Sequence, residues 1–315
     1  MKLLLRLGLV AIVTVTVFLV AGLLATWAPD RTVQSLEPRW AAPPSRFIAV
    51  QGMQVHLRDE GPRDDPLPIV LLHGTSASLH TWDGWAQQLS PKHRVIRVDL
   101  PAFGLTGPRP DADYSIAAYV RFVVALLDAL QVTECALAGN SLGGQIAWNT
   151  ALTHPQRVRK LVLVDAAGYP LLPESVPIGF QLARMPIVRD VMQYVLPRGL
   201  VQSSVRNVYG DPAKVTPELV DRYYDLSLRA GNRQALVQRL QQPLSGNEAA
   251  IPTIRQPTLI LWGTKDRLIP SDHAQRFAHD LPSARLHLFE GLGHVPHEED
   301  PLATVAVVQG FLEQP

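Results

Sequence analysis

The sequence has little of several features that would each point to a particular class of protein. A single cysteine, Cys135, excludes a disulfide within the chain and is expected to be a small buried hydrophobe. The formal net charge is only +1, and we find no basic stripe, repeat or low-complexity tract, so nothing favours a nucleic-acid partner. What is present is 315 residues, 47% of them hydrophobic. That is enough for one large α/β domain with a substantial core.

The N-terminal segment differs from the rest in composition. Lys2 and Arg6 precede an uncharged stretch, Leu7 to Pro29, which as a helix would be about 33 Å long and sufficient to cross a membrane. The stretch is longer than the usual apolar section of a signal peptide, and Trp27 suits an interfacial position. We therefore predict a single-pass membrane anchor over residues 1–29, with a signal peptide as the alternative and the rest of the chain exported.

After this segment the chain is predicted to contain a linker and one domain. Residues 30–45 are rich in Pro and Ala, as linkers often are, and from residue 46 strand-like and helix-like segments alternate. Because the strands are apolar throughout, we predict a mostly parallel sheet with helices on both faces. The predicted strands are 46–50, 53–58, 68–72, 94–100, 134–138, 160–164, 258–262 and 285–289. Ligands of such sheets bind at the carboxyl ends of the strands.

The interval 169–250 interrupts this alternation with prolines, aromatic residues and helical fragments. We predict that it is a helical lid inserted over the sheet. Its apolar residues either pack against one another or line a substrate pocket, and they include Phe180, Leu182, Met185, Ile187, Val191, Met192 and Val195.

A G-x-S-x-G pattern, Gly139-Asn140-Ser141-Leu142-Gly143, directly follows the predicted strand 134–138. A sharp turn between a strand and a helix exposes the serine hydroxyl, and the small residues at 139, 143 and 144 leave room for that turn. The alternative is an ordinary turn. We predict that Ser141 is a nucleophile, which requires a base nearby to remove its proton.

The base and the acid that orients it are predicted from their places after later strands. His294 lies in a glycine-containing loop between a strand and the last helix, and His297 is its competitor. Asp266 follows the strand 258–262 and is the predicted acid, with Asp165 as the second choice. Either aspartate has helix capping or ion pairing as an alternative role.

Backbone N–H groups are expected to stabilise the oxyanion that forms during acyl transfer. Leu142 supplies one at the start of a helix, and Thr75, after His73-Gly74, is predicted to supply the other. We expect His73 to orient its loop and Asp99 to brace the turn that follows it.

These stretches together resemble the α/β-hydrolase superfamily over residues 46–315. The matching segments are 73–78, 99–104, 139–144, 262–266 and 293–298, and Ala102 stands where a glycine is usual. The resemblance implies a Ser141–His294–Asp266 triad, no metal, no cofactor, and a cap inserted after the strand that ends at Asp165.

The resemblance leaves the substrate open. Dehalogenases and epoxide hydrolases of this fold generally have an aspartate where Ser141 stands. Hydrolases that cleave carbon–carbon bonds of ring-fission products share Gly-Asn-Ser-x-Gly-Gly, but usually have a glycine-rich loop at Thr75–Ser78 and a tryptophan at Val295. We therefore predict a carboxylesterase-like enzyme for small to medium apolar acyl esters. The alternatives are such a carbon–carbon hydrolase, a cofactor-free haloperoxidase-like enzyme, a lipid-directed acyl hydrolase, or a tethered binding protein with a degenerate hydrolase fold.

Overall fold

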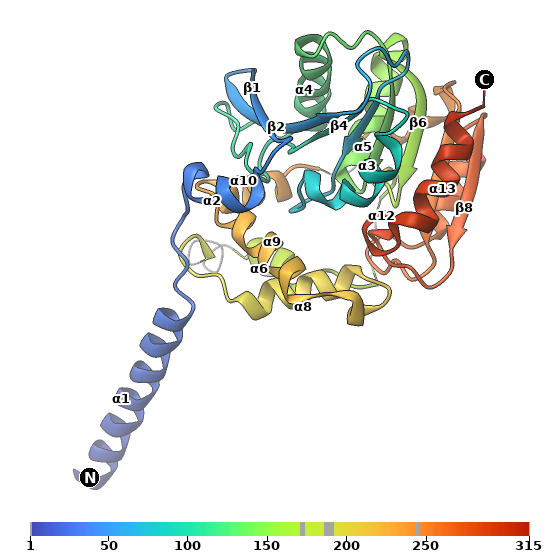
Figure 1. The fold of residues 1–315 in the computed structure, drawn as a ribbon. Coiled ribbons are helices and arrows are strands. Elements are labelled where there is room, and N and C mark those ends of the chain that lie inside the picture. The colour runs from blue at the N-terminus through green and yellow to red at the C-terminus, as the bar shows by residue number, and fades with distance from the viewer. Residues whose placement is uncertain (1, 171–173, 186–191, 244–245, 315) are drawn as a thin grey trace.

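Strands and helices alternate along the chain and form one twisted sheet covered by helices on both faces (Figure 1). The computed structural model describes residues 2–170, 174–185, 192–243 and 246–314. Within these residues the sheet has eight strands in the order β1-β2-β4-β3-β5-β6-β7-β8. They are β1 Arg46–Val50, β2 Met53–Glu60, β3 Ile69–Leu72, β4 Val95–Val98, β5 Cys135–Asn140, β6 Val158–Val164, β7 Thr258–Gly263 and β8 Ala284–Phe289.

The predicted mostly parallel sheet is present. β1 and β2 form an antiparallel hairpin, β2 also pairs antiparallel with β4, and every other neighbouring pair is parallel. Alternate side chains of β3 pack into two separate hydrophobic cores, one on each face of the sheet. Val70 and Leu72 belong to one core, and Ile69 and Leu71 belong to the other. This is why the central strands are apolar at every position.

Helices from both halves of the chain cover the two faces. α4 (Ile116–Ala129), α5 (Leu142–Thr153) and α11 (Asp272–Asp280) contribute to one core, and α3 (Asp83–Leu89) and α13 (Pro301–Leu312) to the other. Side-chain oxygens cap two of the helix starts, because Ser115 accepts from the Ala118 amide and Asp300 from the Ala303 amide. The short helix α12 (Pro296–Glu299) precedes α13.

The helices between β6 and β7 gather at one end of the sheet (Figure 1). In the described part of this interval the α-helices are α6 Ile178–Ala183, α8 Arg198–Val208, α9 Pro217–Ser227 and α10 Asn232–Leu240. We call the described residues 174–243 the cap. They lie within the interval 169–250, over which the sequence predicts a lid. Of the lid residues singled out in the sequence, Ile187 and Val191 lie outside the described residues.

The structure of the N-terminal helix differs from the predicted membrane anchor over residues 1–29. α1 (Lys2–Ala25) extends away from the rest of the molecule (Figure 1). In the part of the chain that the structure describes, no helix combines the length and the apolar character needed to cross a bilayer. The predicted transmembrane anchor at 1–29 is therefore wrong, and so are the membrane partner and the membrane localisation that depended on it.

The residues after α1 are attached to the cap. The Trp27 ring stacks on Tyr194, and the Arg31 guanidinium donates to the Asp225 carboxylate at 2.8 Å. The expected linker, 30–45, contains the helix α2 (Val33–Trp40), which begins at the N-cap Thr32.

Candidate active site

A strained turn between β5 and α5 presents Ser141. Its φ is +53°, in the left-handed region that non-glycine residues seldom adopt. The turn is crowded with backbone: a Cβ at Gly139 would lie 2.2 Å from the carbonyl carbon of Gly143, and a Cβ at Gly143 would lie 2.1 Å from the Leu72 oxygen. Glycine at both positions therefore makes this turn possible.

The structure brings His294 and Asp266 into direct contact. The His294 Nδ1 atom lies 2.7 Å from Asp266 Oδ2, and both residues are 4% exposed. Asp266 Oδ1 accepts from the amides of Leu268 at 2.8 Å and Ile269 at 3.0 Å, which fixes the carboxylate. An acid held in this way sets the tautomer and the orientation of the imidazole ring.

Ser141 and His294 line the same cavity, which we call the serine cavity. Asn140 connects the two, because its Nδ2 donates to the His294 carbonyl at 2.9 Å and to the Val164 carbonyl at 3.1 Å. Sequence reasoning did not assign a role to Asn140. Its position beside the serine within G-x-S-x-G was the only available signal.

His297, the competing base, is in different surroundings. It is 1% exposed, its ring centroid lies 4.0 Å from that of Trp82, and neither ring nitrogen has a hydrogen-bond partner among the described residues. Burial lowers the pKa of His297 well below its ordinary value, so the ring stays neutral. The geometry therefore favours His294 as the candidate base.

Asp165, the second choice for the acid, lies beside Asp266 and is fully buried. Its Oδ1 accepts from the Gly263 amide at 3.0 Å. Burial, and then the negative charge of Asp266, raise the pKa of Asp165 well above its ordinary value. A protonated Asp165 has an O–H available for the neighbouring carboxylate, whereas Asp266 alone contacts the imidazole.

Asp165, Asp266 and His294 also have the composition of a possible metal site, with potential ligand atoms within 4.8 Å of one another. However, both aspartates already accept hydrogen bonds within the chain. Asp266 accepts from His294 and from two amides, and Asp165 accepts from Gly263. The donor set fits a hydrogen-bonded acid–base group better than a metal centre.

The raised pKa of Asp165 predicts a pH-dependent effect on stability. Above a pH of about 4 the unfolded chain ionises at this carboxyl while the folded chain keeps its proton, so the wild type loses stability as pH rises. Asp165→Asn removes this loss. The free energy of unfolding of the variant, relative to wild type, should therefore increase by up to about 1.4 kcal/mol per pH unit as the pH rises above about 4.

Urea denaturation at several pH values measures this difference. Asp64→Asn, at an exposed aspartate, is the matched control and should follow the wild type. Parallel pH dependences of wild type and Asp165→Asn would show that Asp165 is ionised in the folded protein.

The two backbone donors predicted for the oxyanion both border the serine cavity. Thr75 and Leu142 line it, and neither N–H group has an acceptor within the described chain. Leu142 is the first residue of α5, where a helix leaves its N–H groups unpaired. A Cβ at Gly74 would lie 3.2 Å from the Ser141 Cβ atom, so the loop carrying Thr75 passes close to the serine.

Buried polar residues fix the loop that carries Thr75 and the neighbouring turn that begins at Asp99. Asp99 accepts from the amides of Leu79 at 2.7 Å and Leu105 at 2.8 Å and contacts His56 Nδ1 at 2.7 Å. Burial raises the pKa of Asp99 but the adjacent His56 lowers it, and the net shift is downward. His73 accepts from the Leu100 amide through Nε2. Ala102, in the same turn, has a φ of +82°, the region that favours the glycine usual there.

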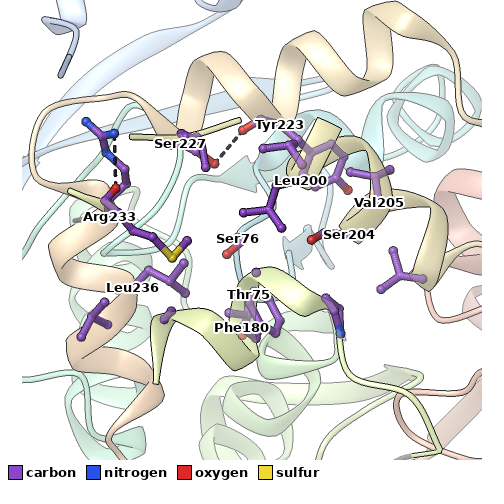
Figure 2. A pocket seen from close by; sticks show the side chains of 18 residues that line it. Thr75, Ser76, Phe180, Leu200, Ser204, Val205, Tyr223, Ser227, Arg233 and Leu236 are labelled. Carbon is purple, nitrogen blue, oxygen red and sulfur yellow. Dashed lines mark hydrogen bonds between the residues drawn. The ribbon is translucent and has the colours of Figure 1, made fainter. Parts of the chain in front are cut away.

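A second cavity adjoins the serine cavity, and the two share Thr75, Phe180, Val208 and Tyr223 as lining residues. Figure 2 shows this second cavity, which we call the apolar chamber, with cap side chains around it. It encloses roughly 890 Å³ of space including its opening. Most of the lining is aliphatic or aromatic: Pro177, Phe180, Ala183, Met192, Leu196, Leu200, Val201, Val205, Val208, Leu236 and Val237.

Two kinds of polar group border these cavities. Arg233 of the chamber is neutralised by Asp30, whose Oδ1 lies 2.6 Å from Nη2. The exposed Arg184 lines the serine cavity and has no ion-pair partner in the described part of the chain. The hydroxyls of Ser76 and Ser204 lie in the chamber (Figure 2).

The chain is similar in sequence and in structure to several known hydrolases. A family profile described as alpha/beta hydrolase fold matches residues 68–301. A 2-hydroxymuconate semialdehyde hydrolase of Pseudomonas sp. strain CF600 is 30% identical over 280 residues, covering 85% of this chain and 94% of that protein. A meta-cleavage product hydrolase structure from Pseudomonas fluorescens IP01 has a TM-score of 0.73 at 26% identity, covering 85% and 97% of the two chains. The structure of a membrane phospholipase A, described as a bacterial virulence factor, has a TM-score of 0.72 at 27% identity and covers 99% and 98%.

Proposed function

Since this chain belongs to the α/β-hydrolase family and is a hydrolase, we propose that Ser141 is its nucleophile, His294 its general base and Asp266 the acid that orients the base. The observation that carries this proposal is the 2.7 Å contact between His294 Nδ1 and Asp266 Oδ2, beside a cavity that His294 and Ser141 both line. The unpaired N–H groups of Thr75 and Leu142 at the same cavity support it.

The reaction proceeds in two halves. His294 takes the Ser141 proton as Oγ bonds to the substrate carbonyl carbon, and the N–H groups of Thr75 and Leu142 bind the resulting oxyanion. The oxyanion collapses, the bond to the leaving group breaks, and His294 returns the proton to that group. Water, deprotonated by His294, then attacks the acyl-enzyme and releases a carboxylic acid and the free serine.

The first candidate for the bond cleaved is a carbon–carbon bond beside a ketone in a ring-fission product. The similarity to the 2-hydroxymuconate semialdehyde hydrolase and to the meta-cleavage product hydrolase supports this candidate over the small apolar ester expected from the sequence. Such substrates carry a carboxylate, and Arg184, which has no ion-pair partner among the described residues, is a cation at the serine cavity that can receive it. The leaving group is then a carbon atom that accepts the proton from His294.

The second candidate is an acyl ester of a lipid, in which the leaving group is an alcohol oxygen. The apolar chamber favours this candidate, because its predominantly aliphatic lining suits a hydrocarbon chain. The similarity to the phospholipase structure, which extends over nearly the whole of both chains, also supports it.

One experiment distinguishes these candidates. The purified protein is offered a vinylogous diketone acid, p-nitrophenyl esters of graded acyl length, and a lysophospholipid, and a fluorophosphonate probe is used to test for a reactive serine. Preferred cleavage of the diketone acid supports the first candidate, and turnover that rises with acyl length supports the second. A folded protein that the probe does not label and that cleaves none of these compounds would contradict the proposed function and favour a binding protein.

A further inference from the structure

A buried carboxylate outside the proposed triad joins the cap to the loop that carries His294. Glu299 ends α12 and is 7% exposed. Its Oε2 accepts from the amides of Gly210 and Gly293, both at 2.9 Å, and its Oε1 accepts from the Asp211 amide at 2.8 Å. Across the described residues no cation pairs with this carboxylate, so three backbone N–H groups compensate its charge.

The two segments that Glu299 joins are in direct backbone contact. A Cβ at Gly293 would lie 2.3 Å from the Gly210 nitrogen, and a Cβ at Gly210 would lie 2.2 Å from the Gly291 oxygen. The His294 amide donates to the Val208 carbonyl at 2.8 Å. The backbone of the candidate base is therefore hydrogen-bonded to the cap.

Val208 also lines both the serine cavity and the apolar chamber. One residue thus borders the space available to an acyl chain and accepts the hydrogen bond from His294. The neighbouring Glu298 adds a second attachment, because its carboxylate pairs with Arg222 and accepts from the Tyr223 hydroxyl at 2.8 Å, both on α9.

We propose that Glu299 is a positioning residue that fixes the cap segment 208–211 to the loop 291–294, so that the occupancy of the apolar chamber controls where His294 lies. This inference rests on the proposed function, in which His294 is the base. An acyl chain that fills the chamber packs against Val208, and the hydrogen bonds around Glu299 hold the imidazole in place relative to Ser141. A short acyl group leaves the chamber empty and lacks this support.

A carboxylate is required at this position because all three of its partners are N–H donors. Glutamine has one carbonyl oxygen, which can keep the two bonds to Gly210 and Gly293. Its NH2 group then faces the Asp211 N–H, and two donors cannot form a hydrogen bond. Glu299→Gln therefore weakens the attachment with little change in side-chain volume, and Glu299→Asp keeps the charge on a shorter side chain.

The test compares kcat and KM for p-nitrophenyl butyrate and laurate in wild type, Glu299→Gln and Glu299→Asp. Rates are expressed per site titrated with a fluorophosphonate, which corrects for any unfolded fraction. Small displacements of a catalytic group can cost about 100-fold in rate. We expect Glu299→Gln to lower kcat for laurate by roughly 10- to 100-fold, to reduce the laurate-to-butyrate ratio of kcat, and to leave KM within about threefold. Glu299→Asp should fall between it and wild type.

Glu290→Gln is the matched control, because Glu290 is exposed beside the same loop and should behave as wild type. A laurate kcat per titrated site in Glu299→Gln within about twofold of wild type, or an equal loss for both esters, would overturn the inference. Hydrogen exchange separates this failure from failure of the proposed function. Even if no ester is cleaved, Glu299→Gln should lower protection of residues 208–211 and 291–294 together, and unchanged protection would contradict the attachment itself.

Discussion

Replacing Ser141 by alanine is expected to lower kcat by about five to six orders of magnitude while the protein remains folded. The variant removes the only atom proposed to bond to the substrate carbonyl, and the proposed oxyanion donors and the cavities stay in place. Serine and alanine are similarly strained at a φ of +53°, so the turn should keep its conformation. Circular dichroism and thermal unfolding check the fold, and single-substrate kinetics measure the loss.

Ser203→Ala is the control for this prediction, because Ser203 is an exposed residue of α8. The fluorophosphonate probe should label wild type and Ser203→Ala but leave Ser141→Ala unlabelled. Residual turnover near the wild-type value would remove Ser141 from the mechanism.

Asp266→Asn is expected to lower kcat by about 10³- to 10⁴-fold, whereas Asp165→Asn should stay within about tenfold of wild type. An asparagine at 266 can present an N–H to His294 Nδ1, which favours the wrong tautomer and withdraws the charge that stabilises the imidazolium. Asp165 does not contact the ring, and its raised pKa keeps it neutral, so asparagine there preserves the charge state.

The two variants are matched in chemistry and lie side by side, so their ratio of kcat is the informative measurement. KM should change little in either, because neither carboxyl lines the cavities. A severe loss in Asp165→Asn with a mild one in Asp266→Asn would reverse the assignment and make Asp165 the orienting acid.

Local sequence patterns predicted most of the sheet. The eight strands lie where strand-like segments were identified, and the central ones were marked by apolar runs because each of them packs into a core on either face. The prediction of a membrane span at residues 1–29 rests on length and composition alone and is wrong, because the structure describes no helix able to cross a bilayer. The helix α3 was not predicted, although its Trp85 and Leu89 pack into one core.

The sequence alone determined the family and indicated the type of chemistry proposed for the candidate site, because G-x-S-x-G and the histidine loop are short motifs that can be read from local sequence. Only the tertiary structure shows that Asp266 contacts the imidazole of His294, while Asp165 accepts from the Gly263 amide and His297 packs against Trp82, since these contacts join residues distant in sequence. The role of Glu299 was also hidden, because its three partners are backbone amides of residues 210, 211 and 293. A backbone N–H is present at nearly every residue, so nothing in the sequence marks which ones a carboxylate will bind.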